Sequence, residues 1–463
     1  MDSLTLNRLR EAIGPENVLT GQADLITHGY DGTATFDALP EAVLTPRSTE
    51  HVSAVLRLAN DRRFGVIPRG SGTGLAGGTV PMPGCVVLVM NRMNRILEID
   101  EENLTVTAEA GAITLDITKA VEARGLFYPP DPSSMKISTI GGNVANNSGG
   151  LRGLKYGVTK DYVMGAEFVL PSGEVLALGN KCVKDVAGYN LKQFLVSSEG
   201  TLGVFTKVML RLIPKPQTKK TMVAYFEKLE DAGRTVSAII AARIIPCTIE
   251  FLDQPTMRCV EDFAHIGLDP SYEAMLLIEC DGRPAVVEEE IQAVRALCES
   301  NHAQAISMAA TEEDGLRLSE ARRTAFSALA RLKPTTILED ATVPRSQIAP
   351  MLRAIQDIAR KYNLQIATFG HAGDGNLHPT ITTDERDRDE MQRVHKAIEE
   401  IFQKAHELGG TITGEHGTGL AKKDIFRRLT PAPYLDVMRR IKRALDPNNI
   451  MNPGKVIDLE PEP

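Results

Sequence analysis

The chain has 463 residues, of which 43% are hydrophobic, and its 52 Lys and Arg against 60 Asp and Glu give a formal net charge of −8. This length predicts two or three packed units, and the acidic balance, without any Lys/Arg-rich block, argues against a nucleic-acid partner. Because no apolar run approaches the roughly 18 residues of a membrane span, and residues 1–14 lack a signal-peptide core, we expect a cytoplasmic protein, or one held at a membrane through a partner.

In chain order, the first half alternates helices with short strands. A helix is expected at residues 4–13 and another at 49–63, where Ser48 or Thr49 supplies the N-terminal cap. A third helix at 115–124 ends at Gly125. The expected strands cover residues 66–68, 86–90, 96–99, 104–109, 166–170 and 204–212, and the prolines at 214 and 216 mark the first domain boundary.

The second half opens with a strand at 221–226 and continues as helix, strand (248–252), helix, strand (274–279) and an acidic helix at 285–300. This alternation predicts a sheet covered by helices, so the fold class is α+β. The last part is polar and helical around 434–444. The expected organisation is an N-terminal helical segment at 1–37, a first domain at 38–215, a second domain at 216–413 and a C-terminal segment at 414–463.

A glycine-rich loop follows the strand at 66–68. The segment 72–77 satisfies the GxGxxG spacing of a dinucleotide turn, but Gly78 and Pro81 forbid the helix that such a turn requires. The loop from Arg69 can instead turn several backbone N–H groups toward one anion. We therefore expect a phosphate site without a helix, with an ordinary glycine-rich turn as the alternative.

Three further loops of the first half carry small and polar residues. The section at 139–150 combines glycines with Asn and Ser side chains, which suit a sugar, a phosphate or the edge of a heterocycle. The turn at 129–134 is stiffened by prolines, and 198–204 leads into a strand. Four loops of this kind in one domain imply an extended dinucleotide.

In order and spacing, these loops resemble the FAD-binding domain of the vanillyl-alcohol oxidase (PCMH) type. The matching motifs are Pro-Arg-Gly-Ser-Gly-Thr-Gly at 68–74, Pro-Asp at 130–131, Ile-Gly-Gly-Asn-Val-Ala-Asn-Asn-Ser-Gly-Gly at 140–150 and Ser-Glu-Gly-Thr-Leu-Gly-Val at 198–204. The resemblance implies that the first loop holds the FAD pyrophosphate and that the 139–150 section runs along the diphosphate and flavin. Since no histidine lies between His51 and His265, it implies FAD bound without a covalent link.

The same resemblance assigns a set of residues to the cofactor. Val204 would lie by the adenine or flavin edge through its backbone, and the C-terminal run at 445–454 contributes one asparagine. The implied cofactor-binding residues are Arg69, Gly70, Ser71, Gly72, Thr73, Gly74, Pro130, Asp131, Ser134, Thr139, Gly142, Asn143, Asn147, Ser148, Gly149, Glu199, Gly200, Val204 and Asn452.

A segment of the second half reads as a hairpin whose tightest turn is a type I′ turn at 374–375. Pairing Gly373 with Asn376 then places His371 opposite His378, with both imidazoles on one face and Cβ atoms about 4.5 to 5.5 Å apart. Such a pair suits Zn²⁺ or another divalent ion when a third ligand lies nearby.

The third ligand is expected from the glycine-rich loop at 411–419, where Glu415 would bind the metal and His416 would take part in the chemistry. Oxidising an alcohol carbon requires removal of the hydroxyl proton while a hydride leaves. A cation on the hydroxyl lowers its pKa, and a histidine near neutrality can take the proton. The same side chains acting without a metal are the alternative.

Here too the sequence resembles a known group. His-Ala-Gly-Asp-Gly-Asn-Leu-His at 371–378 and Gly-Glu-His-Gly at 414–417 are similar to the C-terminal domain of FAD-linked oxidases that act on D-lactate, D-2-hydroxyglutarate or glycolate. The resemblance implies a ferredoxin-like α+β substrate domain, a zinc or manganese ion on His371, His378 and Glu415, and His416 as a base or substrate ligand. It leaves open whether a metal is present.

The substrate's carboxylate needs a cation, and Arg322 best matches the carboxylate-binding arginine of the family, because arginine can bind a carboxylate bidentately. Family members that use dicarboxylates carry a lysine before the Asp-x-x-x-Pro segment, whereas this sequence reads Ile-Leu-Glu-Asp-Ala-Thr-Val-Pro at 337–344. The difference favours glycolate or D-lactate over D-2-hydroxyglutarate.

The six cysteines are scattered without a CxxC pair, which predicts neither disulfides nor an iron–sulfur cluster. Electrons must then leave through a partner, and the resemblance implies an iron–sulfur subunit with a second flavin subunit, or an electron-transfer flavoprotein. A non-catalytic flavin subunit is one rival interpretation, but it should lack the His/Glu cluster. A metal-dependent hydrolase is another, but it leaves the four loops unexplained.

Overall fold

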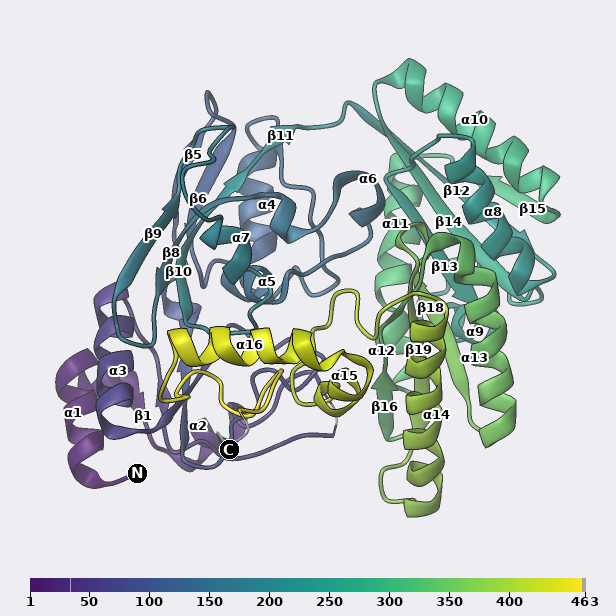
Figure 1. Cartoon of the computed structure of the whole chain (residues 1–463). Helices are drawn as coiled ribbons and strands as arrows, with labels where there is room; N and C mark the ends of the chain where they lie inside the picture. The colour runs from purple at the N-terminus through teal and green to yellow at the C-terminus, as the bar shows by residue number, and fades with distance from the viewer. Residues whose placement is uncertain (34, 460–463) are drawn as a thin grey trace.

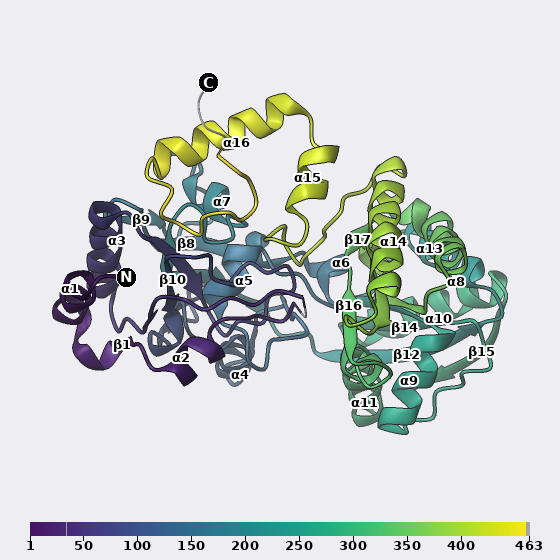
Figure 2. The same cartoon turned by 90° about the horizontal axis from the view of Figure 1, so that it is seen from below.

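The computed structural model describes residues 1–33 and 35–459, which form two lobes (Figure 1). One lobe contains the chain up to residue 214, and the other contains residues 218–407. The chain then returns to the first lobe, where α15 (Lys423–Leu429) and α16 (Ala432–Leu445) lie over it in Figure 2. Residue 34 and residues 460–463, which belong to the expected terminal segments, lie outside the described residues.

The first lobe begins with a four-stranded sheet in the order β1-β2-β4-β3, in which β4 runs parallel to both of its neighbours. Apolar side chains of α1 (Ser3–Ile13) and α3 (Thr49–Arg62) pack with this sheet in one core. Ser48 caps α3, as the sequence predicts. The strands are β1 (Val18–Leu19), β2 (Val43–Leu44), β3 (Gly65–Arg69) and β4 (Cys85–Val89), and α2 (Gln22–Thr27) follows β1.

A five-stranded antiparallel sheet, in the order β5-β6-β10-β8-β9, completes the first lobe. Its core includes residues of α4 (Thr114–Glu122) and α5 (Ile140–Asn146). The strands are β5 (Ile96–Asp100), β6 (Thr105–Glu109), β8 (Val163–Val169), β9 (Val175–Gly179) and β10 (Val204–Arg211). The smaller elements are β7 (Leu126–Phe127), which pairs with β11 (Ile213–Pro214), α6 (Gly153–Tyr156) and α7 (Leu191–Leu195).

Two glycine-rich segments of this lobe behave differently. The loop at 70–79 contains no helix, which confirms the rejection of a dinucleotide-binding turn of the Rossmann type. The section at 139–150, in contrast, is not a loop throughout, because Ile140–Asn146 forms α5. The hydroxyl of Thr139 caps this helix by accepting from the backbone N–H of Gly142 at 3.3 Å. Gly141 is required for close approach, since a Cβ there would lie 2.6 Å from that of Ala110.

The second lobe is built on an eight-stranded antiparallel sheet in the order β15-β12-β14-β13-β18-β19-β16, with β17 also paired to β19. Side chains alternate between its two faces, so the sheet supports two separate cores. The strands are β12 (Thr218–Phe226), β13 (Thr248–Asp253), β14 (Ala274–Gly282), β15 (Ala303–Met308), β16 (Thr335–Leu338), β17 (Ala341–Thr342), β18 (Ile366–His371) and β19 (Asn376–Thr383).

Helices cover both faces of this antiparallel sheet. One core contains residues of α8 (Leu229–Ala241), α10 (Pro284–Ser300), α13 (Ile348–Tyr362) and α14 (Arg388–Glu407). The other core contains residues of α9 (Gln254–Ala264) and α12 (Ala325–Leu329), and α11 (Glu312–Arg323) packs beside it. The α+β fold class predicted from the sequence is confirmed.

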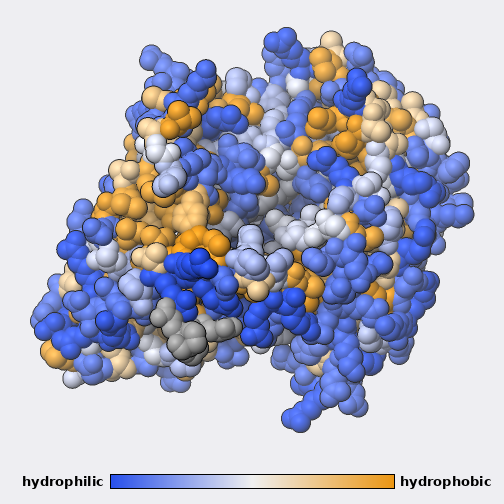
Figure 3. All heavy atoms as spheres, viewed as in Figure 1, coloured by the Kyte–Doolittle hydropathy of each residue, from blue (hydrophilic) through white to orange (hydrophobic). Residues whose placement is uncertain are grey.

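The face shown in Figure 3 is mostly hydrophilic, with apolar patches on both lobes. The large apolar side chains with the greatest exposure among the described residues lie between β9 and α7: Val183, Val186 and Tyr189 are 95%, 98% and 95% exposed. Within the described part of the chain, no helix combines the length and the apolar composition needed to cross a membrane.

Candidate active site

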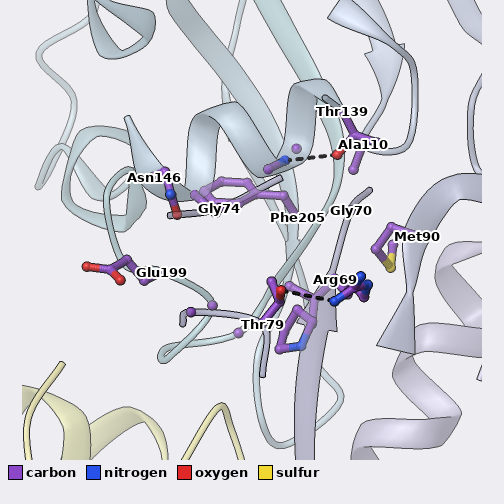
Figure 4. Close-up of a pocket in the computed structure, with 18 of the residues that line it drawn as sticks. Arg69, Gly70, Gly74, Thr79, Met90, Ala110, Thr139, Asn146, Glu199 and Phe205 are labelled. Atoms are coloured by element: carbon purple, nitrogen blue, oxygen red, sulfur yellow. Dashed lines mark hydrogen bonds between the residues drawn. The ribbon is translucent and has the colours of Figure 1, made fainter. Parts of the chain in front are cut away.

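Two neighbouring cavities lie near the contact between the glycine-rich loops of the first lobe and the sheet of the second lobe. Some residues line both of them. The larger has a volume of about 580 Å³ and is lined by the 70–75 loop on one side and by β18 and β19 on the other. The smaller, of about 80 Å³, lies within the first lobe, and Figure 4 shows Arg69, Met90 and Phe205 around it. Gly70, Thr139 and His416 line both cavities, so these form one continuous candidate site.

Most of the residues expected to bind the cofactor line one of these cavities. They are Arg69, Gly70, Ser71, Gly72, Thr73, Gly74, Ser134, Thr139, Gly142, Asn143, Ser148, Glu199, Gly200 and Val204. Five others lie outside this lining, namely Pro130, Asp131, Asn147, Gly149 and Asn452. The sequence motifs therefore predict which segments form the cavity wall, but not every residue that lines it.

Three of these five have structural contacts that connect parts of the site. Asp131 forms an ion pair of 2.5 Å with Arg323, which joins α11 to the first lobe. The side-chain amide of Asn452 donates to the carbonyls of Gly78 and Glu199 at 3.0 and 2.7 Å, so it holds two lining loops together. At Gly149 a Cβ would lie 2.7 Å from a carboxylate oxygen of Glu415, so a side chain there would displace that carboxylate.

The lining fits an extended dinucleotide. Glycine backbone follows the cavity at 70–74 and again at 141–142, where N–H groups can face phosphate oxygens. Buried hydroxyls of Ser138 and Ser198 have no hydrogen-bond partner among the described residues. The guanidinium of Arg69 donates to the carbonyl of Tyr30 at 2.6 Å and to the hydroxyl of Thr79 at 3.2 Å, and Figure 4 draws the latter bond.

The histidine hairpin differs from its predicted register. The chain turns through a short 3-10 segment at Ala372–Asp374, which pairs His371 with Asn376 and Phe369 with His378. The expected pairing of His371 with His378 is therefore wrong by two residues. A shift of two keeps every side chain on its face of the sheet, so both imidazoles still lie together, with ring centroids 5.2 Å apart.

Two buried histidines, His371 and His378, and the partly buried Glu415 form a cluster with the geometry of a metal site. The Nε2 atoms of the two histidines lie 3.2 and 3.4 Å from the same carboxylate oxygen of Glu415. One ligand atom from each residue falls within 4.8 Å of the others. Burial alone would raise the pKa of Glu415, but the two histidines hold it well below its usual range. An anionic carboxylate and two imidazole nitrogens thus converge, as a divalent cation requires.

His416 lies beside this cluster. Its ring stacks on that of His378, with centroids 5.1 Å apart and an interplanar angle of 7°. Its Nε2 atom is 3.9 Å from the Glu415 carboxylate. Burial lowers the pKa of His416 to about 4, although Asp340 opposes the shift, so the ring is neutral at neutral pH. A neutral imidazole in a cavity wall can accept a proton.

Sequence analysis missed Asp340, which organises the loop carrying Glu415 and His416. One carboxylate oxygen of this fully buried residue accepts from the hydroxyl of Thr413 at 2.6 Å and from the backbone N–H groups of Gly414, Glu415 and His416 at 2.8, 3.0 and 3.0 Å. The 337–344 segment was interpreted only as a specificity determinant. In the sequence, the only signal for this role of Asp340 was an acidic pair at the end of a strand-like run.

Asp340 also faces the Nδ1 atoms of His378 and His416, at 3.9 and 4.0 Å, and these three residues form a second group of potential ligands. The ammonium group of Lys422 lies 3.8 Å from the same carboxylate and supplies a positive charge there. A second cation would meet this charge at close range, so we interpret the group as a network that orients the two histidines.

The same loop is held from the first lobe by Glu199, whose carboxylate accepts from the N–H groups of Thr418 and Gly419 at 2.8 Å each. Burial raises the pKa of Glu199. Asp340 and Glu199 therefore fix the two ends of one loop from opposite lobes.

Arg322 lies buried in the wall of the larger cavity, 3% exposed, with its guanidinium 4.6 Å above the ring of Phe369. One of its nitrogens forms an ion pair of 2.6 Å with Glu250. Its Nε atom has no hydrogen-bond acceptor within the described part of the chain. Buried N–H donors of this kind suit an anionic ligand.

Two families match the chain: the FAD linked oxidases, C-terminal domain, at residues 215–456, and the FAD binding domain at 40–179. The glycolate oxidase subunit GlcD of Bacillus subtilis is 56% identical over 449 residues, covering 97% of this chain and 96% of that protein. A D-lactate dehydrogenase of Anaerostipes hadrus is 35% identical over 457 residues, covering 96% and 95%. The structure of p-cresol methylhydroxylase with substrate bound has the same fold, with a TM-score of 0.83 at 18% identity and coverage of 99% and 97%.

Proposed function

The chain belongs to the FAD-linked oxidases and is an FAD-dependent oxidoreductase, and we propose that it oxidises a small 2-hydroxy acid, glycolate or D-lactate, to the 2-oxo acid. One observation carries the proposal: His371, His378, Glu415, His416 and Arg322 converge in the wall of a cavity that the glycine-rich loops also line. Relatives named as a glycolate oxidase subunit and a D-lactate dehydrogenase support it.

Arg322 would bind and orient the substrate carboxylate. Its stacking on Phe369 and its ion pair with Glu250 through Nη2 fix the plane of the guanidinium, while Nε keeps its N–H group for a ligand. An arginine held in this way presents a planar fork that matches a carboxylate. The hydroxyl-bearing carbon next to that carboxylate would then lie on the side of the histidine cluster.

His371, His378 and Glu415 would hold a divalent ion, such as zinc or manganese, which would lower the pKa of the substrate hydroxyl. His416 would take the hydroxyl proton at Nε2, because Nδ1 faces the carboxylate of Asp340. FAD, when bound without a covalent link, supplies the flavin N5 atom that accepts the hydride. The protein's own contribution is thus to orient the acid, exclude water and remove one proton.

The lining near Arg322 favours a monocarboxylate. Phe326, Leu338 and Phe369 give this part of the larger cavity an apolar wall. Among the described lining residues, Arg322 and Arg323 carry the positive charges, and Arg323 is already paired with Asp131. A second substrate carboxylate would therefore meet apolar side chains, which disfavours D-2-hydroxyglutarate.

We further propose that the electrons leave through a separate protein. The chain's relative in Bacillus subtilis is named as a subunit of glycolate oxidase. No cysteine belongs to a potential ligand cluster within the described residues. An iron–sulfur subunit with a second flavin subunit, or an electron-transfer flavoprotein, would fit this need.

The direct test is anaerobic mixing of the purified, FAD-loaded protein with glycolate, D-lactate, L-lactate and D-2-hydroxyglutarate, while flavin absorbance is followed at about 450 nm. We expect bleaching with glycolate or D-lactate. Preferential bleaching by D-2-hydroxyglutarate would contradict the monocarboxylate assignment. Bleaching by none of the acids would refute the proposal and favour a non-catalytic flavin subunit.

A further inference from the structure

A buried carboxylate lies behind both the proposed metal site and the proposed carboxylate site. Glu250 is on β13, directly opposite His371 on β18 in the antiparallel register. Paired residues in adjacent strands point to the same face of a sheet, where their side chains meet. The register therefore forces Glu250 against His371, and the side chain of Glu250 is 0% exposed.

The two oxygens of Glu250 contact different residues. Oε1 lies 2.7 Å from Nδ1 of His371, and Oε2 lies 2.6 Å from Nη2 of Arg322. Both partners are also buried, at 4% and 3% exposure. A single carboxylate thus bridges the residue proposed to hold the metal and the residue proposed to hold the substrate carboxylate.

We infer that Glu250 is a positioning residue that joins these two sites, so that metal binding and hydroxy-acid binding depend on the same side chain. The inference rests on the proposed function, because it uses the roles given there to His371 and Arg322. Glu250 itself does not line either cavity and would touch neither ligand.

The contact with His371 sets the tautomer of that ring. A carboxylate can only accept, so Nδ1 must carry the proton that lies between the two groups. In the neutral form that a metal ligand requires, the lone pair of the ring is then on Nε2, the atom that faces Glu415 at 3.2 Å. A carboxylate that fixes the outer nitrogen of a ligand histidine in this way raises its basicity and its metal affinity.

The contact with Arg322 sets the rotation of the guanidinium. Stacking on Phe369 fixes the plane of the group, and the ion pair fixes which nitrogen points toward the sheet. Burial lowers the pKa of Arg322, while the charge of Glu250 opposes that shift. Since desolvation cancels most of the attraction in a buried ion pair, the pair adds little to folding stability. The clearest physical effect of the ion pair is to orient the guanidinium group of Arg322.

The test uses Glu250→Gln. An amide has one accepting and one donating end, so it cannot accept from both His371 and Arg322. With FAD-loaded protein from which metal has been removed by a chelator, titration with Zn²⁺ or Mn²⁺ gives the metal Kd, and steady-state kinetics give KM and kcat for the preferred acid. We expect the metal Kd to rise about 10- to 100-fold and KM to rise about tenfold, with FAD retained.

Glu250→Asp is the second variant, because it keeps the buried charge but shortens the side chain by one methylene. It should fold like the parent and still raise both quantities, since the shorter carboxylate cannot span the two partners. Glu279→Gln is the matched control. Glu279 is another buried acid, 4% exposed, on the neighbouring strand β14; it pairs with Lys219 at 2.7 Å and lines neither cavity.

A purely structural role for Glu250 would lower thermal stability and leave Kd and KM of the folded, FAD-loaded protein within about twofold of the parent. That result overturns the inference, and so does a change in only one of the two quantities, the metal Kd or the KM for the acid. Failure of the proposed function gives a different pattern. If His371→Ala leaves metal affinity unchanged, or Arg322→Lys leaves KM unchanged, the roles assigned to those residues are wrong whatever Glu250 does.

Discussion

His378 and His416 stack face to face, with ring centroids 5.1 Å apart, and the Nδ1 atoms of both rings face the carboxylate of Asp340 at 3.9 and 4.0 Å. One residue belongs to the proposed metal site and the other is the proposed base. Both Nδ1 atoms therefore face the same buried negative charge, and both Nε2 atoms lie on the side of Glu415. This relationship makes Asp340 the first residue to test.

Asp340→Asn should misplace the loop that carries Glu415 and His416. One oxygen of the carboxylate accepts four hydrogen bonds from residues 413–416. An amide oxygen in that position would lack the negative charge that strengthens these bonds. We expect the free energy of unfolding to fall by about 2 kcal/mol and kcat to fall by roughly 100-fold. Chemical denaturation and steady-state kinetics measure the two effects.

Glu339→Gln is the control for this variant. Glu339 is the adjacent buried acid, and burial raises its pKa to about 7. None of the hydrogen bonds from the 413–416 loop ends on its side chain. Its replacement should leave kcat within about threefold of the parent. Equal losses in the two variants would show that buried charge in general, not Asp340, supports the loop.

The pH profile of kcat/KM should have no acid limb near 6.5. Burial lowers the pKa of His416 from 6.5 to about 4, so the ring stays neutral and able to accept a proton well below neutrality. Activity should fall only as the pH drops through about 4, where the base becomes protonated. A limb near 6.5 that disappears in a His416 variant would contradict the buried, neutral state of this ring.

Arg322→Lys should weaken substrate binding more than catalysis. A lysine keeps the charge near Glu250 but loses the planar fork and the stacking on Phe369. We expect KM for the hydroxy acid to rise about tenfold, with a smaller change in kcat and unchanged FAD content. If kcat alone falls and KM is preserved, the substrate carboxylate binds elsewhere.

Removal of divalent ions by a chelator should abolish turnover while the flavin spectrum persists, because the metal ligands and the glycine-rich loops are separate sets of residues. Addition of Zn²⁺ or Mn²⁺ should restore activity in the parent but not in His378→Ala. Full activity in protein whose metal content is zero by elemental analysis would favour the metal-free alternative.

The sequence predicted most of the elements and the composition of the site. Local signals were sufficient for α3, where Ser48 is the cap, and for the strand before the 70–79 loop. They were also sufficient to bring His371 and His378 to one face, since the two-residue error in register does not change the face. The α+β class follows from the helix-like and strand-like spacing of apolar residues along the chain.

The sequence could not predict the contacts that depend on long-range packing. Glu250 reaches the site from β13 and Asp340 from the connection between β16 and β17, both distant in sequence from the residues they contact, and an acid in such a pattern has no local signature of the group it will meet. The helix α5 was hidden by its glycines and asparagines, which individually disfavour helix, and the cap by Thr139 and the close approach to Ala110 override that preference.

The most direct test of the account compares the parent protein with His416→Ala in single-turnover flavin reduction, both FAD-loaded and metal-loaded, after anaerobic mixing with glycolate or D-lactate. A base that removes the hydroxyl proton typically contributes about 100- to 10,000-fold to the rate. We predict rapid bleaching of the flavin in the parent and at least a 100-fold slower reduction in the variant, at unchanged FAD content. Reduction of the variant at the parent's rate would contradict the account, because the cluster would then not contain the base.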